Sequence, residues 1–241
     1  PHASGWLRPA LRGNRRSTTA FGRGSLMTIQ IYGHPFASFA WKVFIAAYER
    51  DVPFEFCMVD PEHAVNSARM AQLSPTGQFP ALVDGDRHVT QSNSVIEYLD
   101  RFGDAAPMIP IDRDAALNAR MLACIFDSYV SVPVQQIVGE ALRPKDRQDP
   151  DRVAEAKARL DRSYGWLSGR IGASWASGAR FSIADCAAAP ALFYADWVHP
   201  IPSGALKAYR TRVLRRPAVA RVVDEARPYR SLFPLGAPDR D

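Results

Sequence analysis

The sequence predicts an α/β domain over residues 27–103 followed by an all-helical domain over residues 113–241. Two observations predict this division. Strand-like alternation and hairpin signals occur only before residues 104–112, a segment with two prolines that we interpret as a linker. Beyond it, apolar residues recur at helical spacing and strand signals vanish. The element order before the linker reads β-α-β-α-β-β-α, and its β-α-β start predicts a mixed sheet whose first two strands are parallel.

The α/β domain opens with a strand and a helix. Ile29 and Ile31 alternate with polar residues, which predicts a strand over residues 28–32. Apolar residues at helical spacing then predict a helix that ends near Arg50, and Ser38 stands where its N-cap belongs. The further elements follow in order: a strand over 54–59, a helix over 60–72, strands over 80–83 and 87–90 joined by Asp84-Gly85-Asp86, and a helix from Ser92 to Gly103.

The second domain shows only helical patterns. Its first helix is expected to bury one apolar face, formed by Leu117, Met121, Ile125 and Tyr129 together with Leu122 and Phe126. Ser182 and Asp185 form a capping-box-like start of a later helix, which Pro190 should kink. The other predicted helices pass through residues 153–171, 204–215 and 217–226.

The net charge of +5 belongs to one end of the chain. Five of the 30 basic residues lie in residues 1–26, which contain no acid, so the remainder has 25 basic and 25 acidic residues. We therefore expect no nucleic-acid partner for the body of the protein. Residues 1–26 are rich in Gly, Ser and Arg without hydrophobic periodicity. We interpret them as a disordered or non-native extension, with a transit peptide as an alternative.

The sequence carries no signal for a membrane span, a metal site or a disulfide framework. It has no run of about 18 uncharged apolar residues, and its five histidines include no HxxxH or HExxH. Cys57, Cys124 and Cys186 form no CxxC, which is typical of reduced thiols that pack as small hydrophobes. We expect a cytoplasmic protein with no metal and no membrane contact.

The most informative stretch is Gly77-Gln78-Phe79-Pro80 at the start of the predicted hairpin, ahead of Gln91-Ser92 at a helix start. A cis Phe79–Pro80 bond would turn the backbone of Phe79 outward and expose its N–H and C=O to an extended ligand. Ser92 would place a hydroxyl and backbone N–H groups at a helix N-terminus, which suits a carboxylate. A plain N-cap is the alternative for Ser92.

Together these features resemble the glutathione S-transferases over residues 28 to about 236. Residues 74–80 match the family's turn and cis-proline, Gln91-Ser92 its Glu/Gln-Ser glutathione motif, and residues 182–185 the N-capping box of its helical domain. The resemblance implies a thioredoxin-like N-terminal domain, an all-helical glutathione-transferase C-terminal domain, and glutathione as co-substrate.

The same resemblance implies a role for each residue of the motif. The backbone of Phe79, held by the cis-proline Pro80, would pair with the cysteinyl part of glutathione. Gln91 and Ser92 would hold the γ-glutamyl end, and Gln78 would reach the glycyl end.

Thiol activation in this family depends on a Tyr, Ser or Cys after the first strand, which favours the thiolate by hydrogen bonding. Residues 34–42 resemble the segment of bacterial serine-type cytosolic members, which often carries two adjacent serines. This chain keeps the second, Ser38, and has Ala37 at the first. We expect Ser38 to be the catalytic donor, with a mere N-cap as the alternative and weakened activity if the first serine is essential. Tyr32 is a second candidate that is more often a packing residue.

The resemblance implies a transferase that activates the glutathione thiol for attack on a small apolar electrophile, as in detoxification. A glutathione-dependent isomerase, dehalogenase or peroxidase would use the same thiol. A non-enzymatic interaction module is the alternative that Ala37 leaves open. The resemblance also implies a homodimer. Four aromatic residues could line the electrophile pocket but are more often core: Tyr129, Trp166, Trp175 and Trp197.

Overall fold

A four-stranded mixed sheet organises the first part of the chain, which the computed structural model describes over residues 28–171 and 174–241. The strand order is β2-β1-β3-β4, with β1 parallel to β2 and antiparallel to β3. The elements are β1 (Ile29–Gly33), α1 (Ser38–Glu49), β2 (Phe54–Met58), α2 (Ala64–Leu73), β3 (Ala81–Asp84), β4 (Arg87–Thr90) and α3 (Ser92–Leu99). The predicted order and the thioredoxin-like mixed sheet are confirmed. The extension predicted over residues 1–26 lies outside the described residues.

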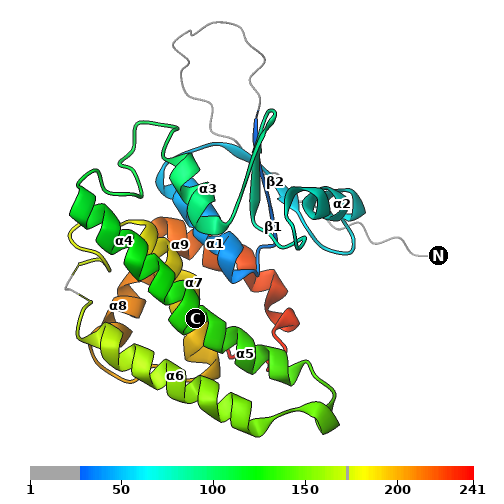
Figure 1. Cartoon of the computed structure of the whole chain (residues 1–241), viewed down its shortest axis with the longest axis vertical. Coiled ribbons are helices and arrows are strands. Elements are labelled where there is room, and N and C mark those ends of the chain that lie inside the picture. The colour runs from blue at the N-terminus through cyan, green and yellow to red at the C-terminus, as the bar shows by residue number, and fades with distance from the viewer. Residues whose placement is uncertain (1–27, 172–173) are drawn as a thin grey trace, which may run out of the picture.

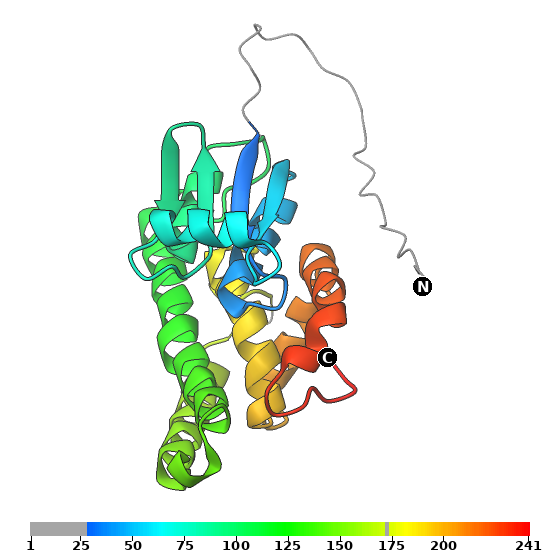
Figure 2. The same cartoon turned by 90° about the vertical axis from the view of Figure 1, so that its right-hand side faces the viewer.

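The sheet is covered on both faces (Figure 2). Because successive side chains of a strand point to opposite faces, Ile31 and Leu82 face α1 and α3 in the main core, while Tyr32 and Ala81 face α2 in a smaller one. This three-layer arrangement leaves the carboxyl end of β1 and the start of β3 next to the helical part of the chain, where the candidate site forms.

The second part of the chain is all-helical (Figure 1). Its elements are α4 (Arg113–Ile125), the π-helical turn η1 (Phe126–Ser131), α5 (Val132–Ala141), the 3-10 turn η2 (Lys145–Arg147), α6 (Pro150–Ser168), α7 (Ile183–Val198), α8 (Ala205–Leu214), α9 (Pro217–Ala226) and the 3-10 turn η3 (Arg227–Leu232). Helix α7 lies at the centre and packs on both α1 and α4, so one hydrophobic core joins the two parts.

The start of α7 is fixed by the predicted capping box. The Asp185 carboxylate accepts the backbone N–H of Ser182 at 2.9 Å, and the Ser182 hydroxyl accepts the N–H of Ala184 at 3.3 Å. Asp185 also accepts the Tyr209 hydroxyl at 2.6 Å and the N–H of Ala176 at 2.8 Å. Burial raises the pKa of Asp185, and these hydrogen bonds oppose that effect. Hydrogen bonds from Ser182 and Asp185 therefore fix the N-terminus of the central helix α7 in the protein interior.

The predicted buried face of the first helix is correct for Leu122 and Phe126 but wrong for three other large residues. Leu117, Met121 and Tyr129 are 67%, 46% and 57% exposed. The helix turns its small residues inward instead: Ala116, Ala119 and Ala123, followed by Phe126 and Val130, are buried. The reason is close packing, because alanines let α4 approach the alanine-rich α7. Apolar spacing alone did not distinguish these two neighbouring faces.

Two smaller differences concern single residues. Helix α3 ends at Leu99 rather than at Gly103, which adopts φ 69° in the following turn. Cys57 and Cys186 are buried as expected, but Cys124 is exposed on α4; all three are free thiols. Among the described residues, the continuous helix Arg113–Ala141 is long and apolar enough to cross a bilayer, a criterion that the core helix of a globular protein also meets.

Candidate active site

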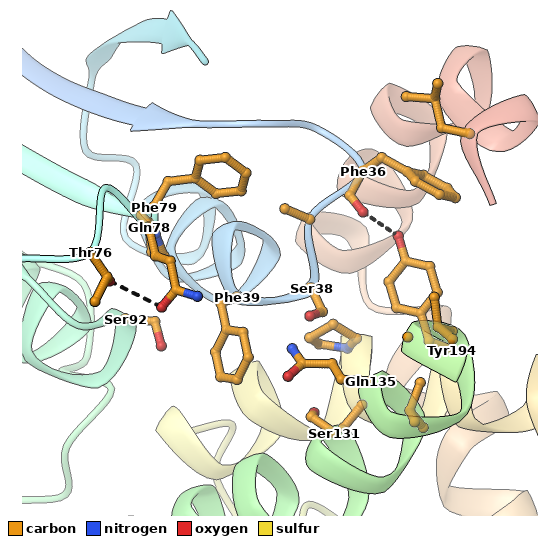
Figure 3. Close-up of a pocket in the computed structure, with 18 of the residues that line it drawn as sticks. Phe36, Ser38, Phe39, Thr76, Gln78, Phe79, Ser92, Ser131, Gln135 and Tyr194 are labelled. Atoms are coloured by element: carbon orange, nitrogen blue, oxygen red, sulfur yellow. Dashed lines mark hydrogen bonds between the residues drawn. The ribbon is translucent and has the colours of Figure 1, made fainter. Parts of the chain in front are cut away.

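A cavity of about 690 Å³ lies between the sheet and the helices (Figure 3). All six residues predicted for the site line it: Ser38, Gln78, Phe79, Pro80, Gln91 and Ser92. They come from α1, from the turn before β3 and from the start of α3, so the fold brings together three segments that are far apart in the sequence. The rest of the wall comes from η1, α5, α7 and residues 232–234.

The turn before β3 forms one polar edge of this cavity. The Phe79–Pro80 bond is cis, as the motif predicts. Gly77 adopts φ 66°, a region that favours glycine. The Thr76 hydroxyl donates to Gln78 Oε1 at 3.2 Å, which leaves the Gln78 amide nitrogen directed to solvent or ligand. Outside the strand ladder, no hydrogen bond among the described residues uses the backbone of Phe79.

The start of α3 forms the second polar edge. Gln91, not Ser92, is the N-cap, and it adopts φ 67°, a region in which a residue with a side chain is strained. Ser92 is the first helical residue and is 6% exposed. Among the described residues, no hydrogen bond uses its hydroxyl. The expected capping role is therefore wrong by one position. The consequence is a free hydroxyl beside the positive end of a helix, which suits a carboxylate.

The start of α1 repeats this arrangement. Ala37 is the N-cap, and Ser38 is the first helical residue rather than the expected cap. Among the described residues, no hydrogen bond uses the Ser38 hydroxyl, which points into the cavity (Figure 3). Because the N-terminus of a helix carries partial positive charge, this hydroxyl sits where a negatively charged atom of a ligand would be stabilised.

Two hydrogen bonds fix the loop that precedes Ser38. Trp41 Nε1 donates to the carbonyl of Pro35 at 2.6 Å. The hydroxyl of Tyr194, on α7, donates to the carbonyl of Phe36 at 2.8 Å. Burial raises the pKa of Tyr194 far above its ordinary value, so this hydroxyl stays protonated and donates. Helix α7 thereby fixes the part of the cavity wall that precedes Ser38.

Tyr32, the second candidate donor, does not line the cavity. It is 6% exposed and packs in the smaller core with Cys57. Its hydroxyl donates to Gln30 Oε1 at 3.4 Å, and burial, followed by the neighbouring Cys57, raises its pKa. These contacts are those of a packing residue on the other face of the sheet.

The remaining wall is apolar. Its side chains are Phe36, Phe39, Val134, Val138, Leu142, Pro190, Ala191, Tyr194, Leu232, Phe233 and Pro234. Ser131 and Gln135 add two polar groups from the long helix, and Figure 3 places Gln135 below Ser38. None of the described residues that line the cavity is charged. A ligand with an apolar, uncharged part fits this wall.

Sequence reasoning missed most of this wall. The four aromatic residues considered for it lie elsewhere: Tyr129, Trp166, Trp175 and Trp197 do not line the cavity. Trp197 and Trp175 pack against the core, as expected, while Tyr129 is exposed. Among the described residues, no group of three or more His, Cys, Asp or Glu side chains could hold a metal ion.

Two families of protein domains match the chain in order. Residues 31–104 match the glutathione S-transferase N-terminal domain, and residues 150–225 match the glutathione S-transferase C-terminal domain. These two matches together span more than half of the chain.

Individual proteins agree with the domain matches. Glutathione S-transferase F6 of Arabidopsis thaliana is 26% identical over 172 residues, which is 69% of this chain and 83% of that protein. A stringent starvation protein A homolog of Pasteurella multocida is 27% identical over 208 residues, 83% of this chain and 91% of that protein. A glutathione S-transferase of Methylobacillus flagellatus, solved with glutathione bound, superposes with a TM-score of 0.71 at 23% identity, over 81% of this chain and 98% of that one. This chain therefore belongs to the glutathione S-transferase superfamily.

Proposed function

We propose that the protein is a glutathione transferase that joins the glutathione thiol to a small, uncharged electrophile. The observation that carries this proposal is the convergence of the free hydroxyls of Ser38 and Ser92 with the open backbone edge at Phe79 on one cavity. The glutathione-bound relative in the same fold supports the ligand. The bacterial serine-type class is the subclass we propose.

Glutathione would lie along the polar edges of the cavity. Its γ-glutamyl carboxylate would meet the start of α3 at Gln91 and Ser92, its cysteinyl backbone would pair with Phe79 before Pro80, and its glycyl end would reach Gln78. This pose directs the sulfur towards the start of α1. It uses helix N-termini and backbone groups for the anion, since the described lining carries no cation.

Ser38 would donate its hydroxyl hydrogen to the glutathione sulfur. A free thiol has a pKa near 8.5, and a depression of two or three units corresponds to roughly 3–4 kcal/mol. A hydrogen bond to the sulfur and the α1 dipole both favour the thiolate. The thiol proton leaves to solvent. The thiolate then forms a carbon–sulfur bond with the electrophile, whose leaving group departs with the electron pair.

The apolar wall supports a neutral electrophile. Transferring a charged substrate into a lining without a countercharge would be costly, whereas Phe36, Tyr194 and Phe233 offer aromatic contact area. Gln135 and Ser131 would supply hydrogen bonds to one polar group of the substrate. Glutathione-dependent isomerase, dehalogenase and peroxidase reactions would use the same thiolate, and the electrophile decides between them.

A Ser38→Ala variant tests this assignment. We expect glutathione affinity, measured by calorimetry, to stay within a few-fold of the wild type because Phe79 and Ser92 are retained. Turnover of a generic aromatic electrophile should fall about 10²-fold, the scale of losing one donor to a developing anion. Unchanged turnover in this variant would refute the role of Ser38.

A non-enzymatic binding module is the second candidate. Ala37 occupies the position of the first serine, and one relative of similar coverage is a stringent starvation protein A homolog rather than a named transferase. This reading predicts glutathione binding without turnover of any electrophile in a broad panel.

We further propose a cytoplasmic homodimer. The free thiols favour a reducing compartment. The exposed Leu117, Met121 and Tyr129 on the long helix favour an oligomer, because large apolar side chains gathered on one helix are typical of interfaces. Light scattering at micromolar concentration should give twice the chain mass, and a Leu117→Glu/Met121→Glu variant should give the monomer mass. A monomeric wild type would refute the dimer.

A further inference from the structure

A buried polar cluster joins α1, α3 and η1. Lys42 is 1% exposed and donates to Asn93 Oδ1 at 2.7 Å and to Asp127 Oδ2 at 2.5 Å. Asn93 Nδ2 donates to the same Asp127 oxygen at 3.1 Å. The three side chains thus close a triangle of hydrogen bonds that contains the Lys42–Asp127 ion pair. None of the three lines the cavity, so the proposed reaction leaves them without a role.

Each member of this cluster lies within four residues in sequence of a serine that lines the cavity. The pairs, one for each element, are Lys42 with Ser38, Asn93 with Ser92, and Asp127 with Ser131. Four residues, about one helical turn, separate the first and the last pair, so their members share one side of the helix. The Lys42 ammonium also lies 5.3 Å from the centroid of the Phe39 ring, which lines the cavity. The cluster therefore connects three elements that each carry a cavity hydroxyl.

The hydrogen bonding of Asp127 is unbalanced. Both donors reach Oδ2, while Oδ1 is buried without a partner among the described residues. A buried polar atom left unpaired is costly, and such costs are expected at functional sites. An ion pair that served stability alone would gain by engaging both oxygens.

The cluster adds no net charge beside the uncharged lining, because the Asp127 carboxylate balances the charge of Lys42. The groups that face Lys42 are Asp127 from η1, Asn93 from α3, and the thiols of Cys124 on α4 and Cys186 on α7. Burial lowers the pKa of Lys42, and the Asp127 carboxylate opposes this effect in part.

We propose that the Lys42–Asn93–Asp127 cluster is a positioning device, which holds the hydroxyls of Ser38, Ser92 and Ser131 at a fixed spacing around glutathione and thereby keeps the Ser38 hydroxyl against the sulfur. This inference rests on the proposed function for its chemical part. Its mechanical part, the joining of three helix turns, is independent of glutathione.

The test variant is Lys42→Met/Asp127→Leu, which removes the ion pair without leaving a lone buried charge. Helix α1 offers a matched control at its other end. There Glu49 forms a two-pronged pair with Arg216 at 2.8 and 2.7 Å. The control variant is Glu49→Leu/Arg216→Met. Asn93→Ala is a second test variant that changes no charge and does not depend on the folding of the double variant.

Two measurements on these variants test the proposal. In the first, the ultraviolet absorbance of bound thiolate is titrated with pH. The double variant should raise the pKa of the bound thiol by about one unit, because the Ser38 hydroxyl is no longer held against the sulfur. The acidic limb of kcat/KM should move to higher pH by the same amount, an about tenfold loss at neutral pH. The Glu49/Arg216 control should match the wild type.

In the second measurement, amide hydrogen exchange is followed without ligand. Exchange in residues 38–44 and 92–97 should be faster in the double variant and in Asn93→Ala than in the control. Wild-type exchange and a wild-type pH profile in the double variant would overturn the proposal. Absence of glutathione binding to the wild type would refute the proposed function, and the exchange data would still decide the mechanical part.

Discussion

The hydroxyl of Tyr194 donates to the backbone carbonyl of Phe36 across 2.8 Å and thereby ties the central helix α7 to the loop before Ser38. A Tyr194→Phe variant leaves that carbonyl unpaired. We expect a loss of about 1–2 kcal/mol in unfolding free energy and a several-fold fall in turnover, because the loop that orients Ser38 is released. Denaturant unfolding and initial rates measure the two effects.

Tyr164→Phe is the matched control for this prediction. Its hydroxyl also donates to a backbone carbonyl, that of His199 at 3.0 Å, and Tyr164 does not line the cavity. This variant should lose a similar unfolding free energy and keep wild-type turnover. Equal turnover losses in both variants would show that Tyr194 acts through global stability alone.

Gln91 combines a positive φ of 67° with a place in the cavity wall. A Gln91→Gly variant relieves the strained backbone, so it should be about 1 kcal/mol more stable than Gln91→Ala. Both variants should bind glutathione several-fold more weakly, since the side chain is lost in each. Asp51, with φ 51° in an exposed turn, is the control: its Gly and Ala variants should show the same stability difference with unchanged binding.

The buried Lys42–Asp127 pair predicts a non-additive stability effect. Lys42→Met alone leaves the Asp127 carboxylate buried without its cation. We expect it to cost about 3–5 kcal/mol. The Lys42→Met/Asp127→Leu double variant should recover most of that loss, because two apolar side chains replace the pair. Chemical denaturation of the two variants measures the coupling. A double variant that is less stable than the single would contradict this account of the pair.

His34 predicts a pH dependence of stability. Burial lowers its pKa below the ordinary 6.5, with Asp60 opposing, and its Nδ1 accepts the N–H of Phe36 at 3.1 Å. A group whose pKa is lower in the folded state stabilises the fold above its unfolded pKa, and this contribution is lost as the pH falls through the folded pKa. The stability of the wild type relative to His34→Asn should therefore decline below about pH 6.5. A difference that is constant from pH 8 to 5 would refute this.

The motif residues could be predicted because their combination resembles a known family; local sequence alone does not indicate a cis Phe79–Pro80 bond, since cis is rare even before proline. The cis Phe79–Pro80 bond, a helix start at Gln91-Ser92 and the Ser182–Asp185 capping box all occur where the family resemblance indicated them. The one-residue shift that makes Ala37 and Gln91 the N-caps was not predictable, because a serine that caps and a serine that begins a helix look alike in sequence.

The apolar wall of the cavity could not be predicted for a different reason. Phe233, Gln135 and Tyr194 reach the cavity only because η3, α5 and α7 converge there in three dimensions. Their sequence neighbourhoods carry no motif. Helical periodicity also failed to choose between the Leu117 face and the alanine face of α4, since packing distance between helices decided it.

Titration of the full chain with glutathione by calorimetry tests the central claim most directly. The account predicts saturable one-site binding below millimolar concentration, lost or much weakened when Ser92 is replaced by Leu and the polar start of α3 is blocked. The Tyr164→Phe chain, altered away from the cavity, should bind like the wild type. No heat of binding at millimolar glutathione would contradict the proposed site and leave only the fold.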